Sequence, residues 1–147
     1  MNRVTVKIGS GNFDEINLVD VVSEAALRHA GFDDETVTRM ALAVREAVAN
    51  GVQHGNKMNP EKRVHITLKL APHEVVVQIQ YEGECFDPEA VPDPLAAENL
   101  LKSRGRGIFL MRNLMDEVKH EFPDDGGTRL TLRKSITVDE ESDEEEE

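Results

Sequence analysis

Three polar residues, Glu46, Asn50 and His54, stand four positions apart in a segment that otherwise consists mostly of Ala, Val and Gly. On a helix, residues four apart lie one turn apart on the same flank, so a carboxylate would lie beside a carboxamide. The small residues around them would let a ligand approach the helix closely. The same spacing also fits a solvated polar face, and the helix alone leaves both interpretations open.

The turn Gly105-Arg106-Gly107 is the second place where the chain could do chemistry. Glycines allow backbone amides to turn toward a ligand, and a helix that starts at such a turn favours an anion. Phosphate is the anion that we expect there. The alternative interpretation is a flexible loop that leads into the helix.

A central helix must position the first group, and its apolar stripe predicts it. The stripe comprises Val37, Met40, Ala41, Val44, Val48 and Val52. Asp33 or Asp34 can cap the start of this helix, and Met58-Asn59-Pro60 marks its stop. A preceding helix is expected to be capped by Asp14 and ended by Gly31.

Alternating apolar and polar residues predict strands over residues 3–8, 63–70, 74–81, 118–122 and 128–133. A third helix is expected over about 107–115. Residues 83–104 lack strong periodicity, which inside a compact domain is typical of a functional lid or of disorder. This order of elements predicts an α+β fold, a two-layer sandwich with about three helices on one face of a mixed, mostly antiparallel sheet.

The chain has 147 residues, a usual size for one domain, and a formal net charge of −12. Eight of the nine residues from 139 to 147 are acidic. We expect residues 135–147 to form a disordered acidic tail, because like charges repel and little apolar surface is available. No basic nucleic-acid face, membrane-spanning run or signal peptide is evident, and Cys85 has no partner for an internal disulfide. We therefore expect a cytoplasmic protein that contacts neither nucleic acid nor a membrane.

Four segments resemble, in order and spacing, the successive motifs of the GHKL, or Bergerat-fold, ATPases. They are Glu46-x-x-x-Asn50-x-x-x-His54, the segment 82–88, Gly105-Arg106-Gly107 and Gly127-Thr128. Within that superfamily the chain is most similar to the small bacterial anti-sigma-factor serine kinases, especially over residues 105–118. The resemblance covers about residues 4–133. It implies a histidine kinase-like ATPase domain at 1–134, ahead of the tail.

The resemblance also implies the cofactors, ATP and Mg²⁺, and the residues that serve them. Glu46 corresponds to the general base and Asn50 to the Mg²⁺ ligand, roles that suit a carboxylate and an uncharged oxygen donor beside a triphosphate. The implied cofactor-binding residues are Asn50, Tyr81, Gly83, Asp87, Gly105, Arg106, Gly107 and Thr128. Thr128 is expected near the adenine, and Arg104 or Arg106 can add charge at the phosphates. His54 fits either a hydrogen-bonded structural role or a catalytic one.

Tyr81 is where the chain departs from the family pattern. The family places an aspartate there, whose carboxylate accepts a hydrogen bond from the adenine amino group; Cys85 also replaces a residue that is usually small. A tyrosine oxygen can accept a hydrogen bond, but its ring is bulkier and holds that oxygen farther from the backbone. Either Tyr81 is turned away and adenine is read differently, or nucleotide binding is weakened or lost.

Three functions follow as alternatives. The first is an anti-sigma factor with ATP-dependent serine/threonine kinase activity, which switches between a sigma factor and an antagonist protein that it phosphorylates. The second is a non-catalytic partner-binding module with a degraded nucleotide site. The third is the catalytic domain of a histidine kinase, which the lack of a helical segment with an acceptor histidine argues against. A homodimer is compatible with the first two.

Overall fold

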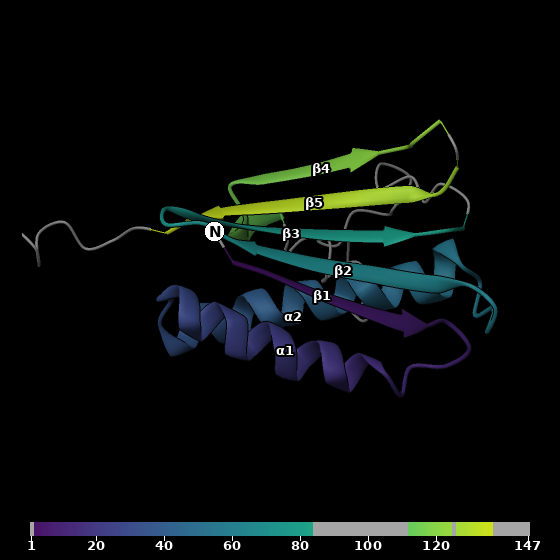
Figure 1. The fold of residues 1–147 in the computed structure, drawn as a ribbon, viewed down its shortest axis with the longest axis horizontal. Helices are drawn as coiled ribbons and strands as arrows, with labels where there is room; N and C mark the ends of the chain where they lie inside the picture. The colour runs from purple at the N-terminus through teal and green to yellow at the C-terminus, as the bar shows by residue number, and fades with distance from the viewer. Residues whose placement is uncertain (1, 84–111, 125, 137–147) are drawn as a thin grey trace, which may run out of the picture.

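The computed structural model describes residues 2–83, 112–124 and 126–136, and Figure 1 shows their arrangement. Its elements are β1 (Asn2–Gly9), α1 (Ile16–Ala30), α2 (Asp34–Asn50), the π-helix η1 (Gly51–Gly55), β2 (Arg63–Leu70), β3 (Glu74–Tyr81), β4 (Glu117–Glu121) and β5 (Thr128–Ser135). Residues 112–114 are also helical and form the described end of the helix expected over 107–115. Among the described helices, none is long and apolar enough to cross a membrane.

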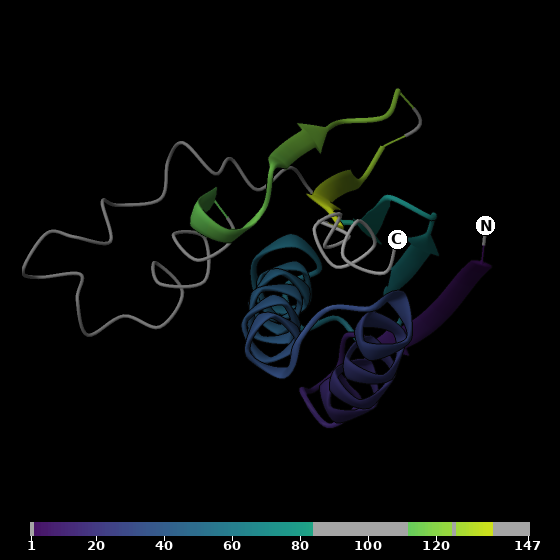
Figure 2. The ribbon, with the colours of Figure 1, turned by 90° about the vertical axis from the view of Figure 1, so that its left-hand side faces the viewer.

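The five strands form one sheet in the order β1-β2-β3-β5-β4, and every pairing between described strands is antiparallel. Helices α1 and α2 lie together beside one face of this sheet (Figure 2). This arrangement confirms the predicted α+β sandwich.

Strand alternation explains how the sheet and helices share one core. In β2, Val64, Ile66, Leu68 and Leu70 are buried, whereas the residues between them are half-buried. Side chains along a strand point alternately to opposite faces, so the buried set faces the helices and the polar set faces away. The apolar stripe predicted for the central helix is buried in full, including Val52.

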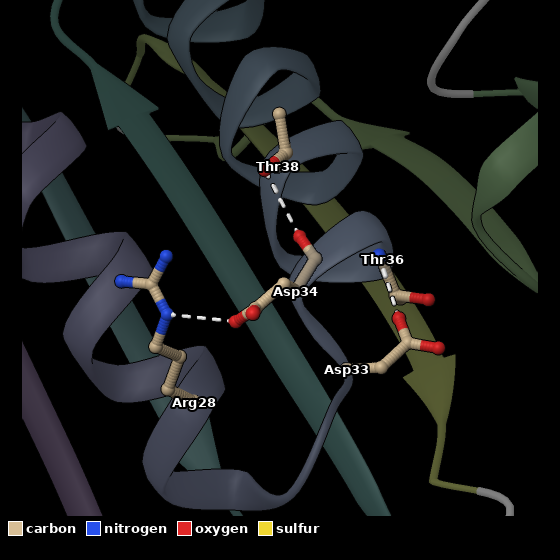
Figure 3. A network of polar contacts seen from close by, with 5 residues as sticks. All are labelled: Arg28, Asp33, Asp34, Thr36 and Thr38. Carbon is tan, nitrogen blue, oxygen red and sulfur yellow. Dashed lines mark hydrogen bonds and ion pairs between the residues drawn. The ribbon is translucent and has the colours of Figure 1, made fainter.

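The two helices are joined by a short turn with its own polar contacts (Figure 3). Asp33 Oδ1 accepts a hydrogen bond from the Thr36 N–H at 2.8 Å, which confirms Asp33 as the cap of α2. Hydrogen bonds from the side chain and the backbone of Thr36 hold the pKa of Asp33 below its ordinary value. Arg28, in the last turn of α1, pairs with Asp34 at 3.3 Å and ties the two helices at this end.

The predicted cap of the first helix was wrong by one residue. Helix α1 begins at Ile16, and neither Asp14 nor the observed cap residue, Glu15, caps it through a side chain. Both residues make other hydrogen bonds, and the Glu15 carboxylate is engaged outside the helix. The Asp14 N–H donates to Asn12 Oδ1 at 2.9 Å, and the Glu15 carboxylate accepts from the Gly9 N–H.

The central helix changes type where the sequence predicted a uniform helix. After Asn50 the backbone widens into the π-helix η1, and the Asn56 N–H bonds the Gly51 carbonyl at 2.7 Å. Lys57 and Met58 then adopt left-handed conformations, with φ of 54° and 58°, and the chain turns toward β2. Single π-turns inside helices are frequent at functional sites, and here the turn directly follows the predicted magnesium ligand.

The end of the sheet bears on the predicted tail. Strand β5 extends through Ser135, the first residue of the expected tail. The Ile136 N–H then donates to the His73 carbonyl at 2.8 Å. The acidic run 139–147 lies outside the described residues.

Candidate functional site

Glu46 lies on α2, one turn before its end, and is half-buried. Burial raises the pKa of this carboxyl above its ordinary value of 4.5, and the nearby Arg45 charge offsets part of that rise. A carboxylate whose pKa is raised is a better proton acceptor near neutral pH than a fully solvated one. The environment of Glu46 therefore suits a general base.

Asn50 is the last residue of α2, and only 5% of it is exposed. It stands one helical turn after Glu46 and immediately before η1, so the two side chains share the flank that the sequence predicted. An amide oxygen is a suitable ligand for a hard cation, and Mg²⁺ commonly combines one or two protein ligands with phosphate oxygens. Among the described residues, no cluster of three or more His, Cys, Asp or Glu is arranged to hold a metal.

Tyr81 ends β3, and 4% of it is exposed. A Cβ atom built on Gly51 would lie 2.8 Å from Tyr81 Cδ1, and one built on Gly55 would lie 2.1 Å from Tyr81 Cε2. The ring therefore rests on η1, in the space left by two glycines four residues apart. Tyr81 is not turned away from the helices.

Thr128 is the cross-strand partner of Tyr81 on the same face of the sheet. It is completely buried, and its Oγ1 has no hydrogen-bond partner in the described part of the chain. Buried hydroxyls are normally satisfied, so an unsatisfied one beside the base-reading position calls for a partner. Ser23 Oγ and Thr131 Oγ1 are likewise buried without a partner among the described residues, and the expected contact of Thr128 with adenine stays a prediction.

Gly83 and Asn56 hold the end of β3 against η1. The Gly83 N–H donates to Asn56 Oδ1 at 2.7 Å, and a Cβ on Gly83 would lie 1.7 Å from the Gly55 carbonyl oxygen. Gly83 therefore has a packing role, and its predicted contact with nucleotide stays a prediction. Asn56 is 1% exposed, and its Nδ2 donates to Ser10 Oγ at 2.7 Å and to the Arg63 carbonyl at 3.1 Å.

Asn56 is the residue that the sequence analysis missed. It joins the ends of β1 and β3 to the start of β2, and it fixes the point at which the segment predicted as a lid begins. In the sequence, an Asn between a helix end and a Pro-containing turn is typical of an ordinary turn residue. Only its burial and its three hydrogen bonds reveal its role.

The remaining predicted site residues are placed as follows. Asp87, Gly105, Arg106 and Gly107 lie outside the described residues, as do Arg104 and Cys85. His54 is half-buried on η1, and its two alternative roles stay open. The structure thus brings Glu46, Asn50, Tyr81 and Thr128 to the region where the end of α2 and η1 meet β3.

A hollow at the same end of the sheet is lined by His65, Gln80, Tyr81, Glu82 and Gly126. Strand alternation places the side chains of His65, Gln80 and Glu82 on the face opposite α2, because their neighbours Val64, Ile79 and Tyr81 are buried. The described lining of this hollow therefore shares Tyr81 with the candidate site but includes neither Glu46 nor Asn50.

Comparison with known proteins gives consistent matches. A family model described as a histidine kinase-like ATPase domain matches residues 14–134. A relative named serine-protein kinase RsbW, from Staphylococcus epidermidis, is 30% identical over 110 residues, covering 70% of this chain and 69% of the relative. A relative named anti-sigma F factor, from Bacillus subtilis (strain 168), is 32% identical over 105 residues, covering 70% of this chain and 72% of the relative. A further RsbW, from Listeria innocua serovar 6a, is 27% identical over 113 residues.

Proposed function

This chain belongs to the histidine kinase-like ATPase family, and on that premise we propose that it is an anti-sigma factor with ATP-dependent protein serine/threonine kinase activity. Its relatives' names, serine-protein kinase and anti-sigma F factor, support both parts of the proposal. In this proposal the protein exchanges a sigma factor for an antagonist protein, phosphorylates the antagonist, and acts in the cytoplasm, where it can form a homodimer.

The observation that carries the proposal is the placement of Glu46 one helical turn before Asn50 at the end of α2. One is a half-buried carboxylate with a raised pKa, and the other is a nearly buried carboxamide one turn away. A solvated polar face would not bury the carboxamide or desolvate the carboxylate. This burial favours a ligand-binding role over the solvated-face interpretation.

In the proposed phosphoryl transfer, Glu46 and Asn50 have separate roles. As the antagonist's hydroxyl oxygen bonds the γ-phosphorus of ATP and the bond to ADP breaks, Glu46 accepts the hydroxyl proton. Asn50 would hold Mg²⁺ through its neutral amide oxygen, and the cation would neutralise charge on the phosphate oxygens. Because Asn50 carries no charge, it adds no repulsion toward the triphosphate.

On the adenine side, the unsatisfied Thr128 hydroxyl supports a bound base. The phenol of Tyr81 replaces the carboxylate that the family uses, so the base would meet neutral groups here. We expect weaker selection of adenine over guanine than a carboxylate gives, because a carboxylate facing the 6-position accepts a hydrogen bond from the amino group of adenine and repels the carbonyl oxygen of guanine.

A second candidate function is the non-catalytic binding module. The burial of the Tyr81 ring against Gly51 and Gly55 favours it, because a ring held there occupies space beside the base-reading position. The two candidates differ in whether nucleotide binds at all.

The deciding experiment is a calorimetric titration of the protein with ATP in the presence and absence of Mg²⁺. Saturable Mg²⁺-dependent binding, followed by transfer to a serine or threonine of an antagonist protein from the source organism, supports the kinase. Phosphoamino-acid mapping by mass spectrometry detects the transfer. No binding of ATP or ADP, combined with tight binding of a sigma factor, would instead favour the non-catalytic module.

A further inference from the structure

The sheet face that points away from α1 and α2, here called the outer face, carries an excess of basic side chains. Strand registers align three rows across all five strands. The rows are Lys7-His65-Gln80-Arg129-Glu121, Thr5-Thr67-Gln78-Thr131-Lys119 and Arg3-Lys69-Val76-Arg133-Glu117. They hold six Lys or Arg residues and two Glu residues, in a chain whose net charge is −12.

Most of this positive charge is not compensated within the described structure. Arg129 pairs with Glu121 at 3.2 Å, and Arg133 pairs with Glu74 at 3.5 Å. The other four basic side chains form no ion pair with the described residues. They are Arg3, Lys7, Lys69 and Lys119, of which all but Lys69 are exposed.

A segment of opposite charge follows the sheet directly in the chain. Residues 139–147 contain eight acidic side chains. The preceding backbone is fixed at Ile136, whose N–H bonds the His73 carbonyl at the turn between β2 and β3. The row that contains Arg3, Lys69 and Arg133 is the nearest of the three to this end of the sheet, because Ser135 pairs with Glu74.

The length of the segment allows it to reach the whole outer face. Eleven residues follow Ile136, and an extended chain of that length spans about 36–40 Å. Three strand spacings separate β5 from β1, or about 14–15 Å. The acidic run can therefore turn back across the sheet from β5 to the basic side chains of β1.

We propose that the acidic segment 139–147 docks on the outer face of its own sheet. There it neutralises the basic side chains that β1, β2 and β5 contribute to the three rows. The bound state needs no fixed conformation, because the rows offer several equivalent positive charges. The occupied face would then be closed to other polyanions, including nucleic acid.

The same chain is favoured over a second copy by local concentration. A short connection holds the acidic run at an effective concentration in roughly the millimolar range, above that of a separate molecule in dilute solution. Exposed ion pairs are individually weak and are screened by salt, with a Debye length of about 8 Å at physiological ionic strength. The docking should therefore be dynamic and should weaken as salt is added.

The test compares amide chemical shifts of two full-length proteins by ¹H–¹⁵N NMR. One is the natural chain, and in the other every Asp and Glu from 139 to 147 is changed to Asn or Gln. At low salt, the amides of β1, β2 and β5 should differ between the two proteins, whereas those of α1 and α2 should coincide. The differences should fall severalfold near 1 M salt, where the Debye length is about 3 Å.

A pair of matched variants identifies the surface. Changing Arg3 and Lys69 to Gln should reduce the shift differences, whereas Arg39→Gln, an exposed change on α2, should leave them intact. Identical outer-face shifts in the natural and neutral-tail proteins at low salt would overturn the proposal. Differences that grow with protein concentration, together with faster sedimentation, would place the segment on a second copy and overturn the assignment to the same chain.

Discussion

The ring of Tyr81 rests on the backbone of Gly55, so closely that a Cβ atom at position 55 would lie 2.1 Å from Cε2 of the ring. No real side-chain contact is that short, so a residue larger than glycine at 55 requires the ring to move. The identity of residue 55 and the presence of an aromatic ring at 81 therefore depend on each other.

This dependence predicts that the effect of Gly55→Ala on the free energy of unfolding depends on whether residue 81 carries a ring. Gly55→Ala should lower the free energy of unfolding by about 1–3 kcal/mol, the usual cost of overpacking. In a Tyr81→Ala background the same change should be neutral or stabilising, because Ala is favoured over Gly in a helix by about 0.5–1 kcal/mol. Urea denaturation of the four proteins measures the coupling. Additive effects within about 0.5 kcal/mol would contradict the contact.

Asn56 should matter more for stability than its place in a turn suggests. Asn56→Ala leaves the buried Gly83 N–H and the Arg63 carbonyl without their partner. Each such group costs about 1–3 kcal/mol, so we expect a loss of at least about 2 kcal/mol. Asn59→Ala is the matched control, because in the described structure the Asn59 side chain accepts an exposed turn hydrogen bond from the Glu61 N–H and its backbone bonds would survive the change. Equal melting temperatures for the two variants would mean that the buried hydrogen bonds of Asn56 stabilise the protein no more than the exposed one of Asn59.

The elements with long regular patterns could be predicted from the sequence, and β2 and β3 begin and end where the alternation does. The pairing of Glu46 with Asn50 was also accessible, because it depends only on helical spacing. The residues that face a given side chain across the core could not be predicted from the sequence. Alternation sends Tyr81 to the core face, but it does not say that the ring meets Gly51 and Gly55.

The outer face was missed for a similar reason. Its basic residues are separated along each strand by core residues and distributed over four strands, so no segment of the sequence reads as basic. Only strand registers bring Arg3 beside Lys69 and Lys7 beside His65. Charge patterns that form across a sheet need the pairing partners, which composition does not supply.

Glu46→Gln should separate catalysis from binding. The change keeps the shape of the side chain and removes the base, and a positioned general base contributes about 10²–10⁴-fold to rate. ATP affinity should stay within a few-fold of the original in a titration, while transfer to the antagonist falls. Transfer at the original rate would remove Glu46 from the mechanism.

The raised pKa of Glu46 adds a stability readout to the same variant. Because the folded protein holds this proton more tightly than the unfolded chain, stability falls as pH rises from the ordinary value of 4.5 through the raised value. Glu46→Gln removes that loss. Its melting temperature should exceed that of the natural protein at pH 7, and the difference should shrink as the pH approaches 4.5. A difference independent of pH would mean that Glu46 is not desolvated.

Asn50→Ala should weaken nucleotide binding only where Mg²⁺ contributes. We expect a loss of about tenfold or more in ATP affinity with Mg²⁺ present, similar to losses at other metal sites, and little change without Mg²⁺. Calorimetric titrations under both conditions measure the difference. An equal loss with and without Mg²⁺ would mean that Asn50 supports the fold or the nucleotide itself and not the cation.

Tyr81→Asp distinguishes the kinase from the non-catalytic module, because it should destabilise the free protein but strengthen the binding of ATP. Removing a ring that is 4% exposed leaves a cavity beside Gly51 and Gly55, and large aromatic truncations cost about 3–5 kcal/mol. The new carboxylate is also buried without a partner in the free protein, which adds to the cost. Without nucleotide, the variant should therefore melt well below the natural protein.

With nucleotide the balance should reverse if the base binds beside Thr128. The carboxylate would accept a hydrogen bond from the adenine amino group, worth about 1.5–3 kcal/mol, or roughly tenfold to a hundredfold in affinity. ATP with Mg²⁺ should then raise the melting temperature of Tyr81→Asp more than that of the natural protein, because ligand binding stabilises by mass action. GTP should give no such gain, since guanine carries a carbonyl at that position. Tyr81→Leu, which removes the phenol without adding an acceptor, is the control and should gain with neither nucleotide. A Tyr81→Asp protein that unfolds easily and binds no ATP would leave the partner-binding module as the function of this chain.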